Sequence, residues 1–515
     1  MFARSCVGSL FAVLLGLGCS GVDRAGSPAA LTLAGATGEG ARYWAPDEGR
    51  VFPARLDYDN EVGTLTTLNL AGPTETRGHA FFTPLGNNSR ACISCHQPAD
   101  GMALSLASVK AAWDESGAAH PLFAAIDGSN CPSLPQADAT SHSLLLRHGL
   151  FRIPRPWPPR AVDGTPIVPE FEIELVRDPA GCNGDPAHGL AAGFVSVYRR
   201  PRPAANLKYA TAIGFAFDPK NGLPLALDPK TGAATSGNLL SDVRALTLEG
   251  QAIDALVSHM QLHGDPDPQQ LRQLVEFESQ IYTAQSSHAG AGSLTEGGAQ
   301  GGPEFLAQAP AGVLQSSAKP IWGELMPWKM LPAPAAGTTD PVWELRQSVA
   351  RGAALFSGRT FLVTDSAGIT DTGFGNPVRN SCAFCHNMQY SGLDVAPGQV
   401  DLGTTNQPHA SLPVGRAAFE LPLFRLTCSR DAAPHPHLGR VVYTHDPGYA
   451  LSTGRCIDIG KITAQSMRGL AGRAPYFANG SARTLREIID YYDSRYAIEY
   501  TEQEKQDLTH LLEVL

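Results

Sequence analysis

Two short stretches of the chain decide its fold: Cys92-Ile93-Ser94-Cys95-His96 and Cys382-Ala383-Phe384-Cys385-His386. Each has the pattern C-x-x-C-H, the signature of covalent attachment of a c-type haem. The two thiols bond to the two vinyl groups on one edge of the porphyrin, and the adjacent histidine gives an imidazole nitrogen to the iron. The sequence therefore predicts two covalently bound c-type haems, attached through Cys92, Cys95, Cys382 and Cys385 with His96 and His386 as axial ligands.

A zinc site built from both C-x-x-C pairs is the alternative interpretation of these motifs. The interval between the pairs is far longer than in a zinc ribbon, and both pairs carry the trailing histidine. These two features favour haem over zinc.

The overall composition sets limits on domain number and partners. At 515 residues, the chain is too long for one ordinary core, so two or three domains are expected. Charged residues make up 17% and hydrophobic residues 43%, as in globular proteins. The net charge of −10 argues against a nucleic-acid partner and favours a basic electron donor.

The N-terminus has the features of an export signal. Arg4 supplies positive charge, and residues 7–18 form an apolar run that is too short to span a bilayer. Cys19 follows Leu15-Gly16-Leu17-Gly18, which is similar to a bacterial lipoprotein cleavage box except that Gly16 stands where leucine is usual. We expect a signal peptide over residues 1–19 and a lipid anchor at Cys19; a plain secretory signal is the alternative.

Export is consistent with c-type haem, which bacteria attach outside the cytoplasm. We therefore expect a periplasmic protein or a lipoprotein of the outer membrane, in contact with the membrane only through the lipid. Residues 20–45 are rich in Gly, Ala and Ser and are expected to form a flexible tether.

Four cysteines remain outside the signal and the haem motifs: Cys131, Cys182, Cys428 and Cys456. In an oxidising compartment an even number of remaining cysteines suggests disulfides, although sequence alone does not fix their connectivity. Each half of the chain contains one pair. The expected disulfides are therefore Cys131–Cys182 and Cys428–Cys456.

The predicted fold class is mainly α, with two cytochrome c-like haem domains. We expect an N-terminal haem domain over residues 46–300, with a long and partly irregular insertion, and a C-terminal one over residues 301–515. In the C-terminal half, Asp340 is a good N-cap ahead of Pro341, and Thr501 with Glu504 forms a capping box. A helix is expected to begin at each of these positions.

The middle of the chain gives weaker signals. Residues 154–169 are dense in proline and are expected to be irregular, whereas residues 171–176 and 193–198 could form short strands. Residues 239–262 and 271–283 are helix candidates, the first of them broken. Residues 286–302 are rich in Gly, Ala and Ser and could connect two domains.

One segment near the C-terminus is specific to a family. It reads Met467-Arg468-Gly469-Leu470-Ala471-Gly472-Arg473-Ala474-Pro475-Tyr476-Phe477-Ala478-Asn479-Gly480-Ser481, followed by Thr484-Leu485-Arg486-Glu487. This segment resembles the C-terminal haem domain of the bacterial di-haem cytochrome c peroxidase / MauG superfamily. The resemblance extends to both haem motifs, to residues 351–356 and to the last helix. It implies that the N-terminal haem reacts with peroxide and that the C-terminal haem stores and relays electrons.

The resemblance also places a sixth iron ligand for the C-terminal haem at Tyr492, since MauG-type proteins have tyrosine there and the peroxidases methionine. Leu485, Ile489 and Tyr492 share one helical face, so Tyr492 is expected to point inward and Tyr491 away. A phenolate is a hard, anionic ligand that stabilises ferric iron. The alternatives are a core tyrosine at this position and the rival ligands Met260, Met388 and Met467.

Three departures from the family pattern concern the chemistry. Ala478 replaces a histidine near the C-terminal haem, and Phe217 stands where a tryptophan usually lies between the haems. The glutamine and glutamate of the peroxide pocket have no clean match; Glu249 and Gln251 are the nearest candidates. Glu249 is our candidate for the acid that moves a proton between the peroxide oxygens, with an exposed helix carboxylate as the alternative.

Other ligands are less well defined. His120, His142 or His148 could bind the N-terminal haem on its open side and close it, or each could be an ordinary surface or core histidine. The superfamily often holds a calcium ion between its domains, but no motif in this sequence is diagnostic of calcium.

The leading functional prediction is an oxidoreductase that uses hydrogen peroxide. It is a peroxidase if a small redox protein donates the electrons, and a MauG-like enzyme if they come from a side chain of a protein substrate. The alternatives are an electron carrier in which both irons have six ligands, and a di-haem oxygenase that cleaves an apolar substrate. The spin state of the first haem separates the carrier from the two enzymes.

Overall fold

The computed structural model describes residues 42–161, 163–212, 226–228, 231–232, 234–309, 323–386, 399–411 and 419–515. The predicted signal peptide, Cys19 and most of the tether lie outside these ranges, as do Phe217 and Met388. Gly35–Leu515 form one compact unit by their contacts, and the predicted domain boundary near residue 300 remains a prediction. Trp44, at the end of the predicted tether, is buried, and its backbone N–H donates to Oε1 of Gln97 at 2.8 Å.

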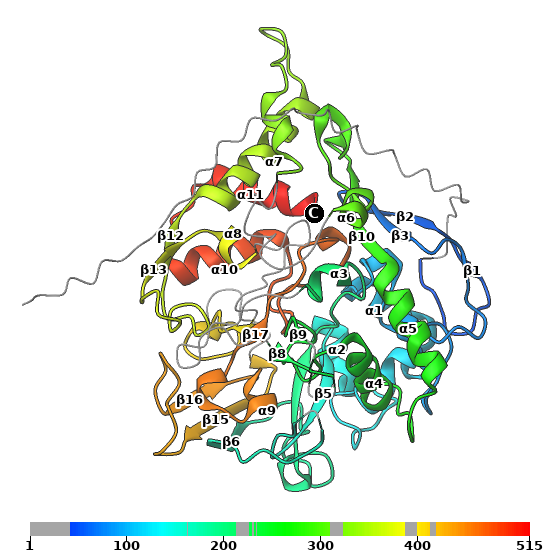
Figure 1. Ribbon diagram of the computed structural model, residues 1–515, viewed down its shortest axis with the longest axis vertical. Coiled ribbons are helices and arrows are strands. Elements are labelled where there is room, and N and C mark those ends of the chain that lie inside the picture. Colours follow the sequence, from blue (N-terminus) through cyan, green and yellow to red (C-terminus); the bar gives the residue numbers. More distant parts are fainter. Residues whose placement is uncertain are drawn as a thin grey trace, which may run out of the picture. The chain divides into compact units, whose positions relative to one another are not determined.

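The prediction of a mainly α fold is wrong. Helices hold 32% of the described residues and strands 18%, the latter in several small sheets (Figure 1). The prediction relied on the helices that flank a haem motif and on an insertion that is only partly irregular. Residues 171–177 and 281–288 of the middle region pair with strands distant in sequence, and such pairing leaves only a weak local signal.

The helices occur along the whole described chain and differ widely in length. They are α1 (Leu106–Ser116), α2 (Ser143–His148), α3 (Leu207–Ala210), α4 (Leu248–Ser258), α5 (Pro268–Gln280), α6 (Pro303–Gln308), α7 (Pro341–Gly358), α8 (Cys382–Cys385), α9 (Ala450–Thr453), α10 (Leu485–Tyr496) and α11 (Glu502–Glu513). Figure 1 shows α7, α10 and α11 grouped around α8, which carries the second haem motif.

The two capped helices of the C-terminal half form as predicted. The side chain of Asp340 accepts hydrogen bonds from the N–H groups of Val342 and Trp343 at the start of α7. Thr501 and Glu504 form the capping box of α11. The two helices pack so closely that a Cβ on Gly352 would lie 2.1 Å from the carbonyl oxygen of Asp507, so only glycine fits at this contact.

The first haem motif lies beside a four-stranded antiparallel sheet in the order β11-β10-β3-β2. Its strands are β2 (Arg55–Asn60), β3 (Gly63–Asn69), β10 (Ile281–His288) and β11 (Gly292–Ser293). The chain passes directly from α5 into β10, so the helix predicted over residues 271–283 ends at Gln280. The predicted connection over residues 286–302 begins inside this sheet.

A second sheet joins the two halves of the sequence. Its order is β16-β15-β6, from β6 (Phe171–Arg177), β15 (Leu423–Cys428) and β16 (Val441–Thr444). The strand predicted at residues 171–176 therefore forms, with a partner about 250 residues away. The strand predicted at residues 193–198 also forms, as β7 (Phe194–Arg199), and it pairs with β5 (Phe151–Pro156) from the edge of the proline-rich stretch.

The remaining strands form short two-stranded pairs. These are β1 (Val51–Phe52) with β4 (Thr74–Glu75), β8 (Ala226–Leu227) with β9 (Ala234–Thr235), β12 (Phe361–Val363) with β13 (Val378–Asn380), and β14 (Gln399–Val400) with β17 (Ile462–Thr463). No helix in the described ranges is both long and apolar enough to cross a membrane.

Both predicted disulfides are confirmed. Cys131 is bonded to Cys182 and Cys428 to Cys456. The four cysteines of the C-x-x-C-H motifs are free thiols, so they remain available for thioether bonds.

Two candidate haem sites

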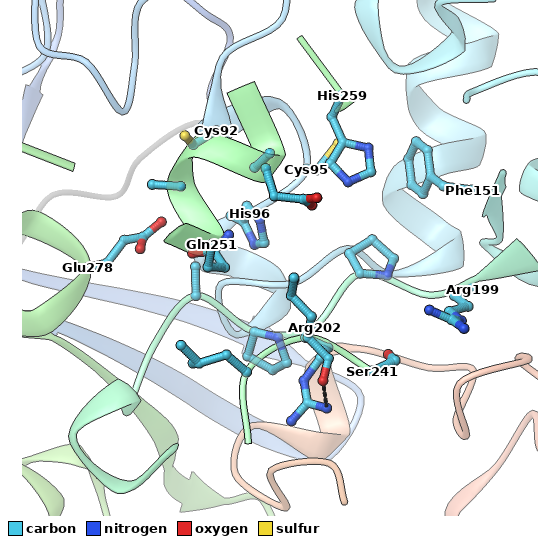
Figure 2. Close-up of a pocket in the computed structure, with 18 of the residues that line it drawn as sticks. Cys92, Cys95, His96, Phe151, Arg199, Arg202, Ser241, Gln251, His259 and Glu278 are labelled. Atoms are coloured by element: carbon cyan, nitrogen blue, oxygen red, sulfur yellow. Dashed lines mark hydrogen bonds between the residues drawn. The ribbon is translucent and has the colours of Figure 1, made fainter. Parts of the chain in front are cut away.

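The first C-x-x-C-H motif opens onto a large cavity. Cys92, Cys95 and His96 line it (Figure 2), together with residues from α4, α5 and the segment 199–205. The empty volume, including the opening to solvent, is about 1430 Å³. Cys92 begins a short 3-10 turn, and the N–H of His96 donates to the carbonyl oxygen of Cys92 at 3.1 Å. This turn brings the two thiols and the imidazole to one wall of the cavity.

The ring of His96 is oriented by a backbone group. Its Nδ1 lies 3.0 Å from the carbonyl oxygen of Met102, so Nδ1–H donates there and Nε2 is left as the basic nitrogen. Burial lowers the pKa of His96 to about 4, which keeps the imidazole neutral. A neutral imidazole with its other nitrogen held by a carbonyl is the usual form of a histidine that binds a metal.

A chain of three polar groups forms another part of the same wall. Nδ1 of His259, which follows α4, lies 2.6 Å from Oδ2 of Asp127. The other oxygen of Asp127 accepts a hydrogen bond from Nη1 of Arg90, and both side chains are buried. Burial alone would raise the pKa of Asp127, but Arg90 and His259 lower it below its ordinary value. Asp127 is therefore an anion that fixes the ring of His259, and Nε2 is the nitrogen left for other partners.

Two further polar side chains line this cavity, Gln251 and Glu278. Glu278 is 4% exposed, and its Oε2 has no hydrogen-bond partner among the described residues. Burial raises the pKa of Glu278 to about 8, so the carboxyl is protonated at neutral pH. Glu249, the predicted acid, is exposed in the first turn of α4 and is not among the residues that line the cavity.

The histidines predicted as possible distal ligands lie elsewhere. Both ring nitrogens of His142 are hydrogen-bonded, to the carbonyl oxygens of Gly128 and Gln136. His148 pairs with Glu420, and His120 accepts a hydrogen bond from the N–H of Leu122. Instead, His259 lies in the cavity. The sequence did not reveal it, because its partner Asp127 is 132 residues away.

The second motif opens onto a more apolar cavity of about 1590 Å³, again including its opening. Cys382, Cys385 and His386 line it, and the ring of Phe356 lies 6.0 Å from that of His386. Most of the other lining side chains belong to the hydrophobic core that includes residues of α7, α10 and α11. The two cysteine pairs thus lie in separate cavities, and the described residues contain no cluster of His, Cys, Asp and Glu suited to a zinc or calcium ion.

Tyr492 lines the second cavity together with His386. Its ring stacks on Tyr496 with centroids 6.3 Å apart, and burial raises its pKa well above the ordinary value. The neighbouring Tyr491 is buried in another direction, where its hydroxyl donates to the carbonyl oxygen of Leu402 at 2.9 Å. This placement is compatible with Tyr492 as an axial ligand, which remains a prediction. Of its rivals, Met467 lines this cavity and Met260 the other.

The two cavities share part of a wall. Arg200, Pro201 and Ser466 line both of them. The residues present fit two c-type haems, because each cavity holds two free thiols and an imidazole on one wall.

Comparison with known proteins gives little further information. No protein-family model matches the chain, and no curated protein matches it. Among solved structures, a MauG-like protein associated with microbial copper homeostasis aligns with 61% of this chain and 80% of its own length, at 16% identity and a TM-score of 0.27. A structural similarity this low shows nothing about the function of this chain.

Proposed function

We propose that this chain is an exported di-haem c-type cytochrome that uses hydrogen peroxide to oxidise a small donor or a protein. His96 would hold the haem that supplies an iron for peroxide, and His386 would hold the haem that supplies a store of electrons. The observation that carries the proposal is the presence of two cavities, each with a complete C-x-x-C-H wall, that share Arg200, Pro201 and Ser466.

When bound, the haems supply an iron that binds peroxide at one site and an electron store at the other. Cys92 and Cys95 hold the first and Cys382 and Cys385 the second. His96 is pre-oriented by the carbonyl of Met102, so its Nε2 needs little reorganisation to bind iron. Holding that ring in one orientation also sets the basicity of the ligand.

His259 is the group best placed to move a proton in the first cavity. Peroxide cleavage requires a proton to leave one oxygen and reach the other, which is a task for a positioned acid–base group. Asp127 holds Nδ1–H of His259, so Nε2 can take the proton and return it. Gln251 lines the same cavity and can donate a hydrogen bond to a bound oxygen. Glu249, being exposed, would have to act from outside this wall.

In the second cavity, His386 and Tyr492 would hold the haem iron. An anionic phenolate favours oxidised iron, whereas a methionine thioether would favour the reduced state. With tyrosine this haem suits the withdrawal of electrons from a difficult donor, such as a side chain of a protein substrate. A small redox protein is the other donor class, and the net charge of −10 favours a basic one. Localisation in the periplasm or at the outer membrane, through a lipid on Cys19, is part of the same proposal.

One observation favours a second candidate function, that of an electron carrier. His259 lies in the same cavity as His96, and two imidazoles on one iron would close it to peroxide. The carrier and the peroxide-using enzyme therefore differ in the number of ligands on the first iron.

The deciding experiment is the electron paramagnetic resonance and visible spectrum of the ferric protein, before and after one equivalent of peroxide. We expect a high-spin signal from the first haem that peroxide removes rapidly. Two low-spin haems that peroxide leaves unchanged, even after half-reduction, would exclude the enzyme and support the carrier.

A further inference from the structure

The arginines in the interior of the described chain fall into two groups. Some pair with a carboxylate: Arg199 binds Asp446 and Asp242, and Arg468 binds Glu324. The others have no ion pair among the described residues, and of these Arg200, Arg202 and Arg473 line a candidate haem cavity, whereas Arg152 and Arg495 do not. Within the described part of the chain these three donate only to backbone carbonyl oxygens and form no ion pair.

Each of the three arginines has a definite set of carbonyl partners. Nη2 of Arg200 donates to the carbonyl oxygens of Leu104 and of Arg473, the latter at 2.9 Å, while Nη1 of Arg200 has no hydrogen-bond partner in the described ranges. Arg202 donates to the carbonyls of residues 240, 463 and 464, and Arg473 to those of residues 466 and 468. Carbonyl dipoles orient these guanidinium groups but do not neutralise their charge.

The electrostatics of the three groups shows the missing charge. Burial, reinforced by Arg473, lowers the pKa of Arg200 to about 9 and that of Arg202 to about 10. Burial lowers the pKa of Arg473 to about 10 as well. By contrast, the carboxylates beside Arg199 raise its pKa above the ordinary value. Arginine stays protonated in proteins, and a buried charge without a counter-charge is strongly unfavourable. Asp100 and Asp242 offset this loss only in part, and no carboxylate of the described residues pairs with the three groups, so an anion from outside the polypeptide would complete the site.

The positions of the three arginines match the two cavities. Arg200 lines both, Arg202 lines only the first and Arg473 only the second. Figure 2 shows Arg202 at the end of the first cavity away from Cys92 and Cys95. A c-type haem is attached by its vinyl edge, and its two propionate carboxylates project from the opposite edge. The end of the cavity that holds Arg202 is thus where carboxylates are expected.

We propose that Arg200, Arg202 and Arg473 bind the haem propionates, with Arg200 shared between the two haems. The inference rests on the haem attachment in the proposed function and is independent of the peroxide chemistry. The positive charges of the three guanidinium groups pair with the negative charges of the propionate carboxylates. Each propionate thereby neutralises an arginine that would otherwise have no counter-charge. Through Arg200 the charge at one haem acts directly on the other.

The test is a redox titration of the holoprotein and its variants, after the haem content has been measured as the pyridine haemochrome. Replacing a positive charge beside a haem with a neutral group favours ferric iron and lowers the reduction potential. We expect Arg202→Gln to lower the potential of the first haem alone, Arg473→Gln that of the second alone, and Arg200→Gln both. Arg468→Gln is the matched control, because Arg468 is buried, is paired with Glu324 and lines neither cavity; it should leave both potentials unchanged.

Lysine variants keep the positive charge of the arginines, so the test still works if the glutamine variants do not fold. Resonance Raman spectra should show a shifted propionate bending band in Arg202→Lys for the first haem only and in Arg200→Lys for both. Potentials or Raman bands that do not follow this pattern in a protein with two attached haems would overturn the inference while leaving the proposed function standing. A protein without attached haem would instead refute the proposed function.

A free anion such as inorganic phosphate is the competing source of negative charge. Propionates are tethered, so the wild-type potentials should not depend on phosphate concentration at constant ionic strength. A phosphate-dependent potential that disappears in Arg200→Gln would overturn the propionate assignment in favour of a free anion.

Discussion

Nδ1 of His259 lies 2.6 Å from Oδ2 of Asp127, and Asp127 is in turn bound by the buried Arg90. This contact fixes both the tautomer and the orientation of the His259 ring, because an ionised carboxylate can only accept a hydrogen bond and Nδ1 must therefore carry the proton. The nitrogen that remains, Nε2, belongs to a ring that lines the same cavity as His96. Three residues from distant parts of the chain thus build one oriented base in the wall of the first candidate haem site.

His259→Gln is expected to slow the reaction of the ferric protein with peroxide by roughly 10² to 10⁴-fold, the range that a positioned acid–base group usually contributes. Stopped-flow spectroscopy at the first haem gives the rate. His263→Gln is the control, because His263 is exposed and does not line the cavity. If peroxide reacts equally fast with both variants, His259 has no part in the proton transfer. A first haem that changes from low to high spin in His259→Gln would identify His259 as an iron ligand.

Asp127→Asn tests how much the ion pair of Asp127 with Arg90 contributes to the stability of the fold. The substitution leaves the guanidinium of Arg90 buried without its counter-charge, and breaking a buried pair typically costs about 3–5 kcal/mol. We expect a loss of this size in the free energy of unfolding, measured with urea at neutral pH. Glu174→Gln removes one partner of an exposed pair with Arg425 and should cost less than about 1 kcal/mol. Similar losses in the two variants would show that Asp127 is not an essential counter-charge.

The raised pKa of Glu278 predicts that the stability of the fold decreases as the pH rises. Its pKa is raised by burial to about 8 in the folded chain, from an ordinary value of 4.5, so the folded state binds the proton more tightly than the unfolded state does. Its contribution to stability is therefore present below about pH 4.5 and is lost as the pH rises to about 8.

Glu278→Gln should remove this loss, because glutamine keeps the shape of the protonated carboxyl and does not ionise. The difference between variant and wild type, followed by thermal unfolding from pH 5 to pH 9, should grow with pH and then level off. It can reach several kcal/mol, since one pKa unit corresponds to about 1.4 kcal/mol. A constant difference across this range would mean that Glu278 ionises normally in the folded protein.

Features encoded within a few residues were predictable from the sequence. The C-x-x-C-H motifs, the N-cap at Asp340 and the capping box of Thr501 and Glu504 each depend on contacts within one or two helical turns, and each is found in the structure. Cys131–Cys182 and Cys428–Cys456 followed from counting cysteines in each half. The placement of Tyr492 in one cavity with His386 also agrees with the helical periodicity of α10.

Features that depend on tertiary contacts were not predictable. β6 gains its partner β15 about 250 residues later, and α5 gives way to β10 at residue 281 because β3 offers a pairing edge there. These pairings made the mainly α prediction wrong. The contact of His259 with Asp127 and the missing counter-charges of Arg200 and Arg473 are likewise invisible locally. Glu249 was chosen for its residue type, and only the exposure of its face of α4 shows that it lies outside the cavity.

Tyr492 and Tyr491 provide a matched pair for the second haem. Both tyrosines lie on α10 and contact Phe477, but only Tyr492 lines the cavity, whereas the hydroxyl of Tyr491 is bound to the carbonyl of Leu402. Tyr492→Phe removes the phenolate, so the second haem should lose its sixth ligand and become high-spin. Tyr492→Met should raise its reduction potential, because a thioether favours ferrous iron. Electron paramagnetic resonance and a redox titration check both, and Tyr491→Phe should leave both unchanged. If Tyr492→Phe keeps the wild-type spectrum, another side chain binds the iron, and Met467, which lines the same cavity, becomes the residue to replace next.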